Sequence, residues 1–196
     1  MDKINNSINE FEEIIDNIYG IYLDGTWGFG LLRKEMARLQ RKTLSSFANK
    51  TAQLTQKEID SRKIYYGDGP PNDKDSIILH EVTQGELKER NKDNGQNFHF
   101  LANSCIVILY QYWESHYRKN IAKLLGINKN KLKSQIFGDL RLLRHSIIHH
   151  RAVALPDVNN CEIINWFSEG DKIRINKKRM QEIIKYIKIY LNSIGQ

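Results

Sequence analysis

Residues 98–125 read FHFLANSCIVILYQYWESHYRKNIAKLL, and this stretch decides the fold. Apolar side chains recur in it at steps of three and four residues, which is the period of an α-helix. The apolar surface is wide, as a helix covered on several sides requires. Gly126 comes next and suits the position just after a helix end. We therefore expect a long helix over 98–125 at the centre of a helical core.

The sequence after this helix predicts another helix, a hairpin and a last helix. Asn128 or Asn130 is placed to cap the first of these. Residues 161–167 and 172–175 flank a turn and predict a small β-hairpin over 161–175. Asn176 is placed to cap the last helix, which extends to about Leu191. One apolar stripe marks the helix before the hairpin: Leu132, Ile136, Leu140, Leu143 and Ile147.

The sequence before residue 67 predicts two helices. Isoleucines and Phe11 recur with helical spacing, so Asn5–Tyr22 is expected to be an amphipathic helix. Residues 24–30 contain three glycines and predict a turn that ends it. Leu31 to about Ile64 predicts a second, more polar helix, with an interruption near Asn49.

The middle of the chain predicts a loop and one short strand. Residues 67–73 are rich in Gly, Pro and Asp and mark the loop, and 76–82 has the composition of a strand. Residues 84–97 are polar and are expected to be mobile. We place a soft domain boundary here, with an accessory helical region at 1–95 and a compact helical core at 96–196. The fold class is therefore mainly α, a helical bundle with an N-terminal helical extension and a C-terminal β-hairpin.

Composition narrows the class of protein. The chain has 196 residues, 40% hydrophobic and 27% charged, which is ordinary for a globular protein. Cys105 and Cys161 are far apart, which gives neither a disulfide framework nor zinc-ligand spacing. The first residues lack the apolar segment of a secretory signal, and no apolar run is long enough to cross a bilayer. We expect a cytoplasmic protein without membrane association.

Charge is distributed unevenly along the chain. Met1–Leu31 contains six acidic residues and one lysine, whereas His116–Arg151 contains nine Lys or Arg and one acidic residue, Asp139. Such asymmetry predicts a localised positive surface that attracts a polyanion. Lysines that merely solvate the outer faces of helices are the alternative for any single residue.

Residues 138–151 read GDLRLLRHSIIHHR and carry the residues suited to phosphodiester chemistry. Arg144 is permanently charged and offers a planar fork of donors to phosphate oxygens. His149 titrates near neutrality and transfers protons without a metal. RNA supplies its own nucleophile, the ribose 2′-hydroxyl. Metal-independent RNA cleavage is therefore within the capacity of this segment.

The spacing of Arg144 and His149 indicates a symmetric dimer. At about 100° per residue, the two positions lie roughly 140° apart around a helix. One copy does not easily aim both side chains at one point unless the helix ends near His149. A second copy facing the first would supply the missing groups in a composite site on the two-fold axis.

The run Arg144-His145-Ser146-Ile147-Ile148-His149 resembles the R-x4–6-H signature of HEPN domains, in which a polar residue follows the arginine. Residues 139–143 resemble the usual run-in to this signature, and 113–118 resemble part of the preceding long helix. The resemblance covers about half the chain, from Phe98 to Leu191.

The resemblance implies a HEPN-like helical bundle that forms homodimers with paired motifs. Many members are metal-independent endoribonucleases of toxin–antitoxin, abortive-infection and antiviral systems. It implies that Arg144 binds the scissile phosphate, His149 is the general acid/base and His145 is the polar helper, with no cofactor and no metal. His150 also falls within the allowed spacing, so which histidine is the acid/base stays open. The expected partners are RNA, a second copy and an antitoxin or other regulatory RNA or protein. The basic residues expected to bind RNA are Arg118, Lys133, Arg141, His150 and Arg151.

Several alternatives remain at this stage. Arg144 and His149 would also serve as cations that stabilise a helix C-terminus. Glu114 and Arg118, four residues apart, predict an ion pair rather than a catalytic acid. A metal site at the histidines is disfavoured because no carboxylate lies at the companion spacing. The alternative functions are a non-catalytic HEPN module that binds RNA or protein, and a helical interaction protein without a nucleic-acid role.

Overall fold

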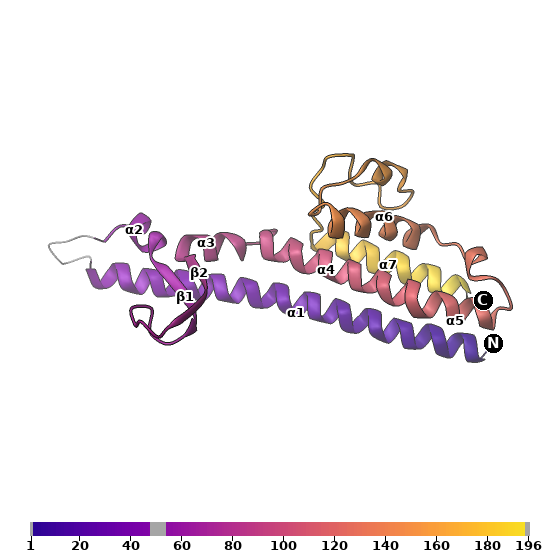
Figure 1. Cartoon of the computed structure of the whole chain (residues 1–196), viewed down its shortest axis with the longest axis horizontal. Helices are drawn as coiled ribbons and strands as arrows, with labels where there is room; N and C mark the ends of the chain where they lie inside the picture. The colour runs from indigo at the N-terminus through magenta and orange to yellow at the C-terminus, as the bar shows by residue number, and fades with distance from the viewer. Residues whose placement is uncertain (1, 48–53, 195–196) are drawn as a thin grey trace. The chain divides into compact units, whose positions relative to one another are not determined.

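The computed structural model describes residues 2–47 and 54–194, and it is mainly helical with a small two-stranded antiparallel sheet (Figure 1). The α-helices are α1 (Asp2–Phe47), α2 (Gln56–Ser61), α3 (Gln84–Arg90), α4 (Gln96–Tyr112), α5 (Arg118–Leu124), α6 (Gln135–His149) and α7 (Lys177–Ile194). A π-helical turn, η1 (Trp113–Tyr117), joins α4 to α5, and η2 (Lys129–Lys131) and η3 (Pro156–Asn160) are 3₁₀ helices. The strands are β1 (Lys63–Asp68) and β2 (Ile77–Thr83).

The described residues form two units. The first contains the chain up to Gly25 together with the chain from His99 onward, and the second contains Thr26–Phe98. The predicted accessory region, 1–95, therefore needs correction at its amino end. Ile8, Phe11 and Ile15 of α1 are buried in the same core as α4–α7, because the apolar stripe of α1 packs against these helices. The predicted boundary itself lies close to the division between Phe98 and His99.

The core of the first unit is built on aromatic side chains. The rings of Trp113 and Phe137 stack with centroids 4.2 Å apart and an interplanar angle of 8°. Phe11 stacks on Tyr117 at 4.5 Å, and the ring of Tyr190 meets Trp113 edge-on. These contacts join α1, η1, α6 and α7 in one core.

The long helix expected over 98–125 is confirmed, and it contains a feature that the periodicity did not predict. It begins at Gln96 and ends at Leu124, and Gly126 follows with φ +68°. The π-helical turn widens the helix at 113–117 and places Trp113 and Tyr117 together on the buried face. The side chains of Trp113 and Tyr117 thus both reach the core.

The break predicted at residues 24–30 is wrong, because α1 is continuous from Asp2 to Phe47. A Cβ atom at Gly25 would lie 2.5 Å from Leu101 Cδ2, so glycine is needed where α1 and α4 approach closely. Packing along the helix thus overrides the low helix propensity of glycine. The second predicted helix, Leu31 to about Ile64, corresponds to the end of α1 and to α2, but Ile64 itself lies in β1. The interruption predicted near Asn49 lies outside the described residues.

The strand predicted at 76–82 is confirmed as β2, and its antiparallel partner β1 was not predicted. The predicted loop at 67–73 connects the two strands. The segment over 84–97, which was expected to be mobile, contains α3 and the start of α4. Thr83 and Glu86 form a reciprocal capping box that starts α3, and α4 begins at Gln96.

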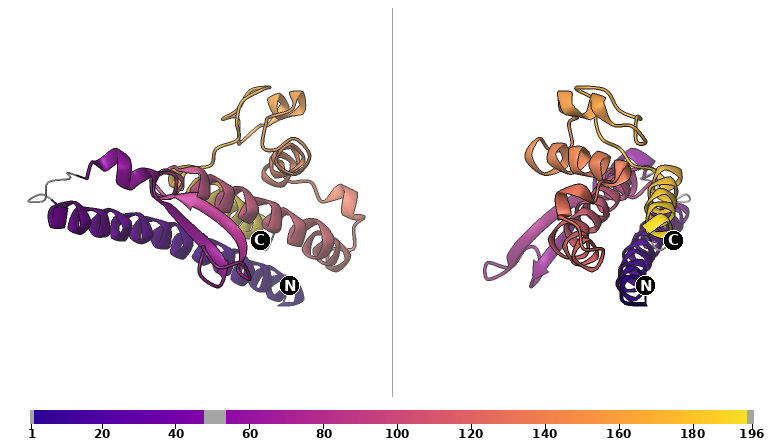
Figure 2. Two further views of the ribbon diagram at one scale, coloured as in Figure 1. Left: turned by 60° about the vertical axis from the view of Figure 1, so that its left-hand side comes forward. Right: turned by 90° about the vertical axis from the view of Figure 1, so that its right-hand side faces the viewer.

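The C-terminal β-hairpin predicted at 161–175 is wrong. Among the described residues, the only bridge of this segment joins Lys172 to Val153, and residues 170–173 form backbone hydrogen bonds with 152–154. The amides of Glu162, Ile163 and Ile164 have a different partner, the carboxylate of Asp139, at 2.7–3.0 Å. Both would-be strands are thus paired elsewhere, and the segment forms an irregular loop over α6 (Figure 2).

Asp139 therefore fixes the loop to α6. Its side chain is buried, and a charged acceptor of three backbone amides makes stronger hydrogen bonds than a neutral one. We expect Asp139→Asn to lower the free energy of unfolding by about 2–3 kcal/mol, because an amide replaces the charge and presents donors to donors. Urea unfolding followed by circular dichroism measures this loss. Asp157→Asn, at an exposed carboxylate, is the matched control. Equal stability of the two variants would contradict the role of Asp139.

Candidate active site

Helix α6 carries the motif. The Ser134 hydroxyl accepts a hydrogen bond from the Phe137 amide and caps the start of the helix, in place of the predicted Asn128 or Asn130. Leu140 and Leu143 are fully buried, so the opposite side of α6 faces outward. The helix ends at His149, which is the case in which the spacing argument allowed one copy to bring Arg144 and His149 together.

Arg144 is half-buried on an aromatic ring. Its guanidinium carbon lies 5.6 Å from the centroid of the Tyr110 ring, within the range of a cation–π contact. The Nε atom is buried and finds no hydrogen-bond partner among the described residues. A buried donor without a partner costs about 1–3 kcal/mol of stability. The fold therefore leaves the Nε donor of this guanidinium unused at a cost.

Three imidazoles gather at the C-terminal end of α6. The rings of His145 and His149 have centroids 5.2 Å apart, and those of His145 and His150 are 6.0 Å apart, both edge to face. All three side chains are exposed. The chain then turns sharply, with Arg151 and Ala152 in the left-handed region at φ +52° and +58°. Non-glycine residues adopt this conformation rarely, and here it directs the chain back toward α6.

A cavity of about 440 Å³ lies beside these histidines. Two predicted RNA-binding residues, His150 and Arg151, line it together with His149 and Lys172. The Lys172 ammonium donates to the Arg151 carbonyl at 3.0 Å, which fixes its position. No Asp or Glu lines this cavity, so its field favours an anion.

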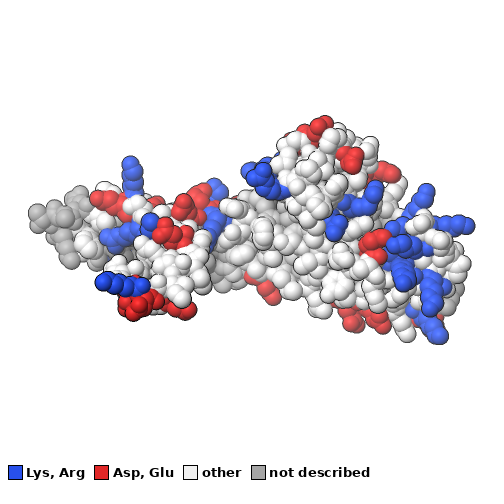
Figure 3. Space-filling model, in the orientation of Figure 1, with Lys and Arg blue, Asp and Glu red and all other residues white. Residues whose placement is uncertain are grey.

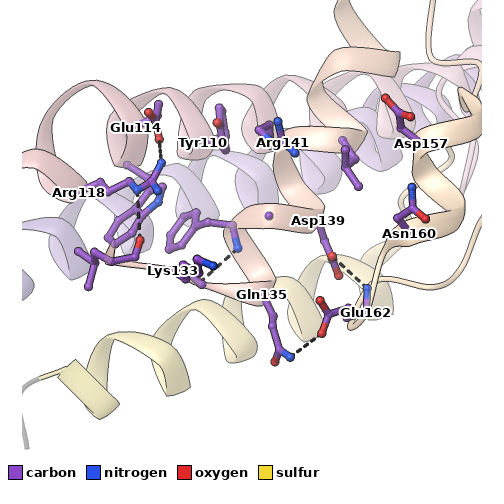
Figure 4. Close-up of a pocket in the computed structure, with 16 residues that line it drawn as sticks. Tyr110, Glu114, Arg118, Lys133, Gln135, Asp139, Arg141, Asp157, Asn160 and Glu162 are labelled. Atoms are coloured by element: carbon purple, nitrogen blue, oxygen red, sulfur yellow. Dashed lines mark hydrogen bonds and ion pairs between the residues drawn. The ribbon is translucent and has the colours of Figure 1, made fainter. Parts of the chain in front are cut away.

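The other predicted RNA-binding residues, Arg118, Lys133 and Arg141, line a second cavity of about 780 Å³ (Figure 4). Arg118 donates to the Glu114 carboxylate at 2.8 Å and to the Leu132 carbonyl, which confirms the predicted ion pair. Burial raises the pKa of Glu114, but hydrogen bonds from Arg118 and Lys129 outweigh it, so the pKa lies below its ordinary value.

Tyr110 connects Arg144 to this second cavity. Its ring carries the Arg144 guanidinium, and the residue also lines the cavity. Burial raises the pKa of the Tyr110 hydroxyl and Glu114 adds to the rise, while Arg141, Arg118 and Arg144 oppose it. Three guanidinium groups therefore lie close enough to act on one hydroxyl.

The predicted site residues thus fall into two neighbourhoods along α6. His149, His150 and Arg151 share the smaller cavity, whereas Arg144 and His145 line neither cavity. Neither of these two cavities is lined by both Arg144 and His149. Two relevant residues were not predicted to act here. Tyr110 was expected only to fill the core, and Lys172 is 21 residues beyond Arg151 in a segment expected to form a strand, so no local sequence signal placed it here.

The described residues contain neither a membrane-spanning helix nor a metal-binding cluster. In the described parts of the chain, no helix combines the length and the apolar composition needed to cross a lipid bilayer. Within residues 2–47 and 54–194, no cluster of three or more His, Cys, Asp and Glu side chains is arranged to hold a metal ion.

No family model, no curated protein and no solved structure matches this chain. The function of the chain is therefore inferred from the geometry of its own residues.

The Glu114–Arg118 pair predicts a pH-dependent contribution to stability. A carboxyl group whose pKa is lowered by folding stabilises the protein above its unfolded pKa, and this contribution is lost as the pH falls through the folded pKa. We expect Glu114→Gln to be less stable than the wild type at pH 7, with the difference shrinking as the pH falls below the ordinary value of 4.5. Urea unfolding at pH 7 and pH 3 measures both differences. The control is Glu169→Gln at an exposed position, and a pH-independent difference for Glu114→Gln would contradict the interpretation.

Proposed function

We propose that this protein is a metal-independent endoribonuclease of HEPN type. The observation that carries the proposal is the cluster of His145, His149 and His150 at the end of α6, beside a cavity lined by two cations and no carboxylate. Arg144 lies five residues before His149 on the same helix, with a buried donor that the described residues do not use. Phosphodiester cleavage needs these two kinds of group.

The proposed reaction is an internal transfer at phosphorus. The ribose 2′-oxygen attacks the adjacent phosphorus, the bond from phosphorus to the 5′-oxygen breaks, and the products are a 2′,3′-cyclic phosphate and a 5′-hydroxyl. One imidazole accepts the 2′-hydroxyl proton, and an imidazolium donates a proton to the leaving oxygen. We assign these roles to His149 of one copy, with His150 able to share them, and this histidine faces Arg144 of the other copy. Arg144 neutralises the charge that develops on the phosphate.

The same proposal includes a homodimer with a composite site. Neither of the two cavities is lined by both Arg144 and His149, and their angular separation on α6 is best met by a facing copy. Exposed apolar side chains of α6 and α4 provide surface for such a contact. Ile148 of α6 and Ile108 and Tyr112 of α4 are each more than 40% exposed.

The charge distribution supports an RNA substrate. Lysines gather over α5 and the loop that follows it, where Figure 3 shows a dense group of basic side chains. A localised positive surface of this kind attracts a nucleic-acid backbone. We propose a cytoplasmic setting in bacterial defence, as a toxin or an abortive-infection nuclease, with an antitoxin or other regulatory partner that restrains it. The exposed lysines of this group are Lys119, Lys123, Lys129, Lys131 and Lys133.

RNA cleavage in the presence of EDTA tests the activity directly. We expect the wild type to cleave single-stranded RNA, and Arg144→Ala and His149→Ala each to lower the rate at least about 100-fold, because charge stabilisation or proton transfer is lost. Gel analysis of the ends should show the cyclic phosphate. His116→Ala, at an exposed histidine on η1, is the matched control and should retain activity. Activity that disappears on chelation would overturn the mechanism, and RNA binding without cleavage would favour a non-catalytic module.

Mixing the two inactive variants tests the composite site. A heterodimer of Arg144→Ala and His149→Ala retains one arginine and one histidine, contributed by different subunits. If these two groups act together across the axis, the mixture should recover activity that neither variant has alone. Analytical ultracentrifugation of the mixture establishes that dimers form, and subunit exchange is checked with a tagged copy. Exchanged dimers without activity would contradict the composite arrangement.

A further inference from the structure

The larger cavity beside α6 has the features of a nucleotide subsite. Arg118 and Lys133 lie on one side of it in Figure 4, Asp157 and Asn160 lie on the other side, and Arg141 lies beside Tyr110. Its volume of about 780 Å³ is within the range of ligand pockets. We propose that this cavity binds a nucleotide unit of the RNA strand next to the scissile phosphate, with Arg141 and Lys133 holding its phosphate. The inference rests on the proposed function for the identity of the strand.

Arg118, Lys133 and Arg141 line this cavity together with four carboxylates, those of Glu114, Asp139, Asp157 and Glu162. Three of its carboxylates are already engaged: Asp139 accepts three amides, Glu114 accepts from Arg118 and Lys129, and Glu162 accepts from Gln135. Arg141 and Lys133 are exposed, and in the described parts of the chain their side chains form no hydrogen bond or ion pair. Two cations thus remain available, which suits a phosphate group.

Gly138 keeps the cavity open. It lies in the first turns of α6 and lines the cavity, and a Cβ atom built there meets no heavy atom within 4 Å. Glycine inside a helix is less favourable than alanine by about 1 kcal/mol, so a residue with a side chain would stabilise the helix without a steric clash. The missing side chain therefore leaves space for a ligand rather than for a neighbouring element.

Tyr110 lies between the cavity and the proposed catalytic arginine, because it lines the cavity and its ring contacts the Arg144 guanidinium. Arg141 and Arg144 are three residues apart on α6, a rise of about 4.5 Å, and both act on the Tyr110 hydroxyl. A strand whose scissile phosphate is bound by Arg144 therefore has its neighbouring phosphate within reach of Arg141. Asp157 and Asn160, across the cavity, offer acceptors and a donor to ribose hydroxyls and base edges.

Binding of a fluorescein-labelled 2′-O-methyl RNA 12-mer, which lacks the nucleophile, tests the inference independently of cleavage. Anisotropy titrations at several salt concentrations give the Kd and its salt dependence. We expect Arg141→Gln and Lys133→Gln each to raise the Kd about fivefold and to lower the slope of log K against log salt by about 1. Gly138→Leu fills the cavity and should raise the Kd about tenfold, with stability checked by urea unfolding. Gly138→Ala should bind within about twofold of the wild type, because a methyl group leaves most of the space.

Arg174→Gln and Lys185→Gln are the matched charge controls, at exposed positions outside the cavity. If Arg141→Gln and Lys133→Gln lose no more affinity for the 12-mer than these two controls, the inference is overturned. It is also overturned if the wild type does not bind the 12-mer. Should Gly138→Leu fail to fold, the two charge variants still decide. Complete displacement of the 12-mer by an equal concentration of a 5′-mononucleotide would mean that the cavity takes free nucleotides, against a strand subsite.

The two proposals fail separately. RNA that binds through Arg141 but is not cleaved refutes the nuclease and leaves the subsite. If cleavage needs Arg144 and His149 but does not need Arg141, Lys133 or an open cavity, the subsite proposal is refuted and the nuclease proposal stands.

Discussion

The stacking of Phe137 on Trp113 is the contact on which the arrangement of the site depends. It fixes the rotation of α6 about its own axis, because Phe137 enters the core through one face of the helix. Leu140 and Leu143 follow on the same face. With that face buried, the arginines and histidines of α6 emerge on the sides that remain. A different rotation of α6 would bury charged groups without partners, which costs far more than the stack contributes.

Asp139 adds a second constraint, because it joins α6 to the loop that follows it. Its carboxylate lies on the buried side of α6 and holds residues 162–164, so the loop after α6 is fixed at its middle. The loop in turn places Lys172 against Arg151 and shapes the smaller cavity. The same carboxylate lines the larger cavity. One buried acid therefore supports both neighbourhoods that flank Arg144, although it has no assigned part in the chemistry.

The parts of the structure that the sequence predicted are those controlled by local periodicity and capping. The helices over 98–125, around the motif and from Asn176 onward each carry an apolar stripe that no other conformation would bury. The Glu114–Arg118 pair was predictable for the same reason, since residues four apart on a helix are neighbours. The errors lie where distant residues decide. Gly25 predicts a helix break, but α1 continues through it because glycine fits where Leu101 packs against α1. Residues 161–175 predict a hairpin, but their amides donate instead to the Asp139 carboxylate and the Ala154 carbonyl.

The sequence by itself determined a helical protein with a basic centre and placed Arg144, His145 and His149 near the end of one helix, because these properties follow from spacing of three to five residues. Only the tertiary structure decided what surrounds them. It set Arg144 on Tyr110, brought Lys172 to Arg151, and opened a second cavity around Gly138. Each of these contacts joins residues far apart in the chain. Contacts between residues far apart in the chain depend on how the whole core packs, so the local sequence pattern does not predict them.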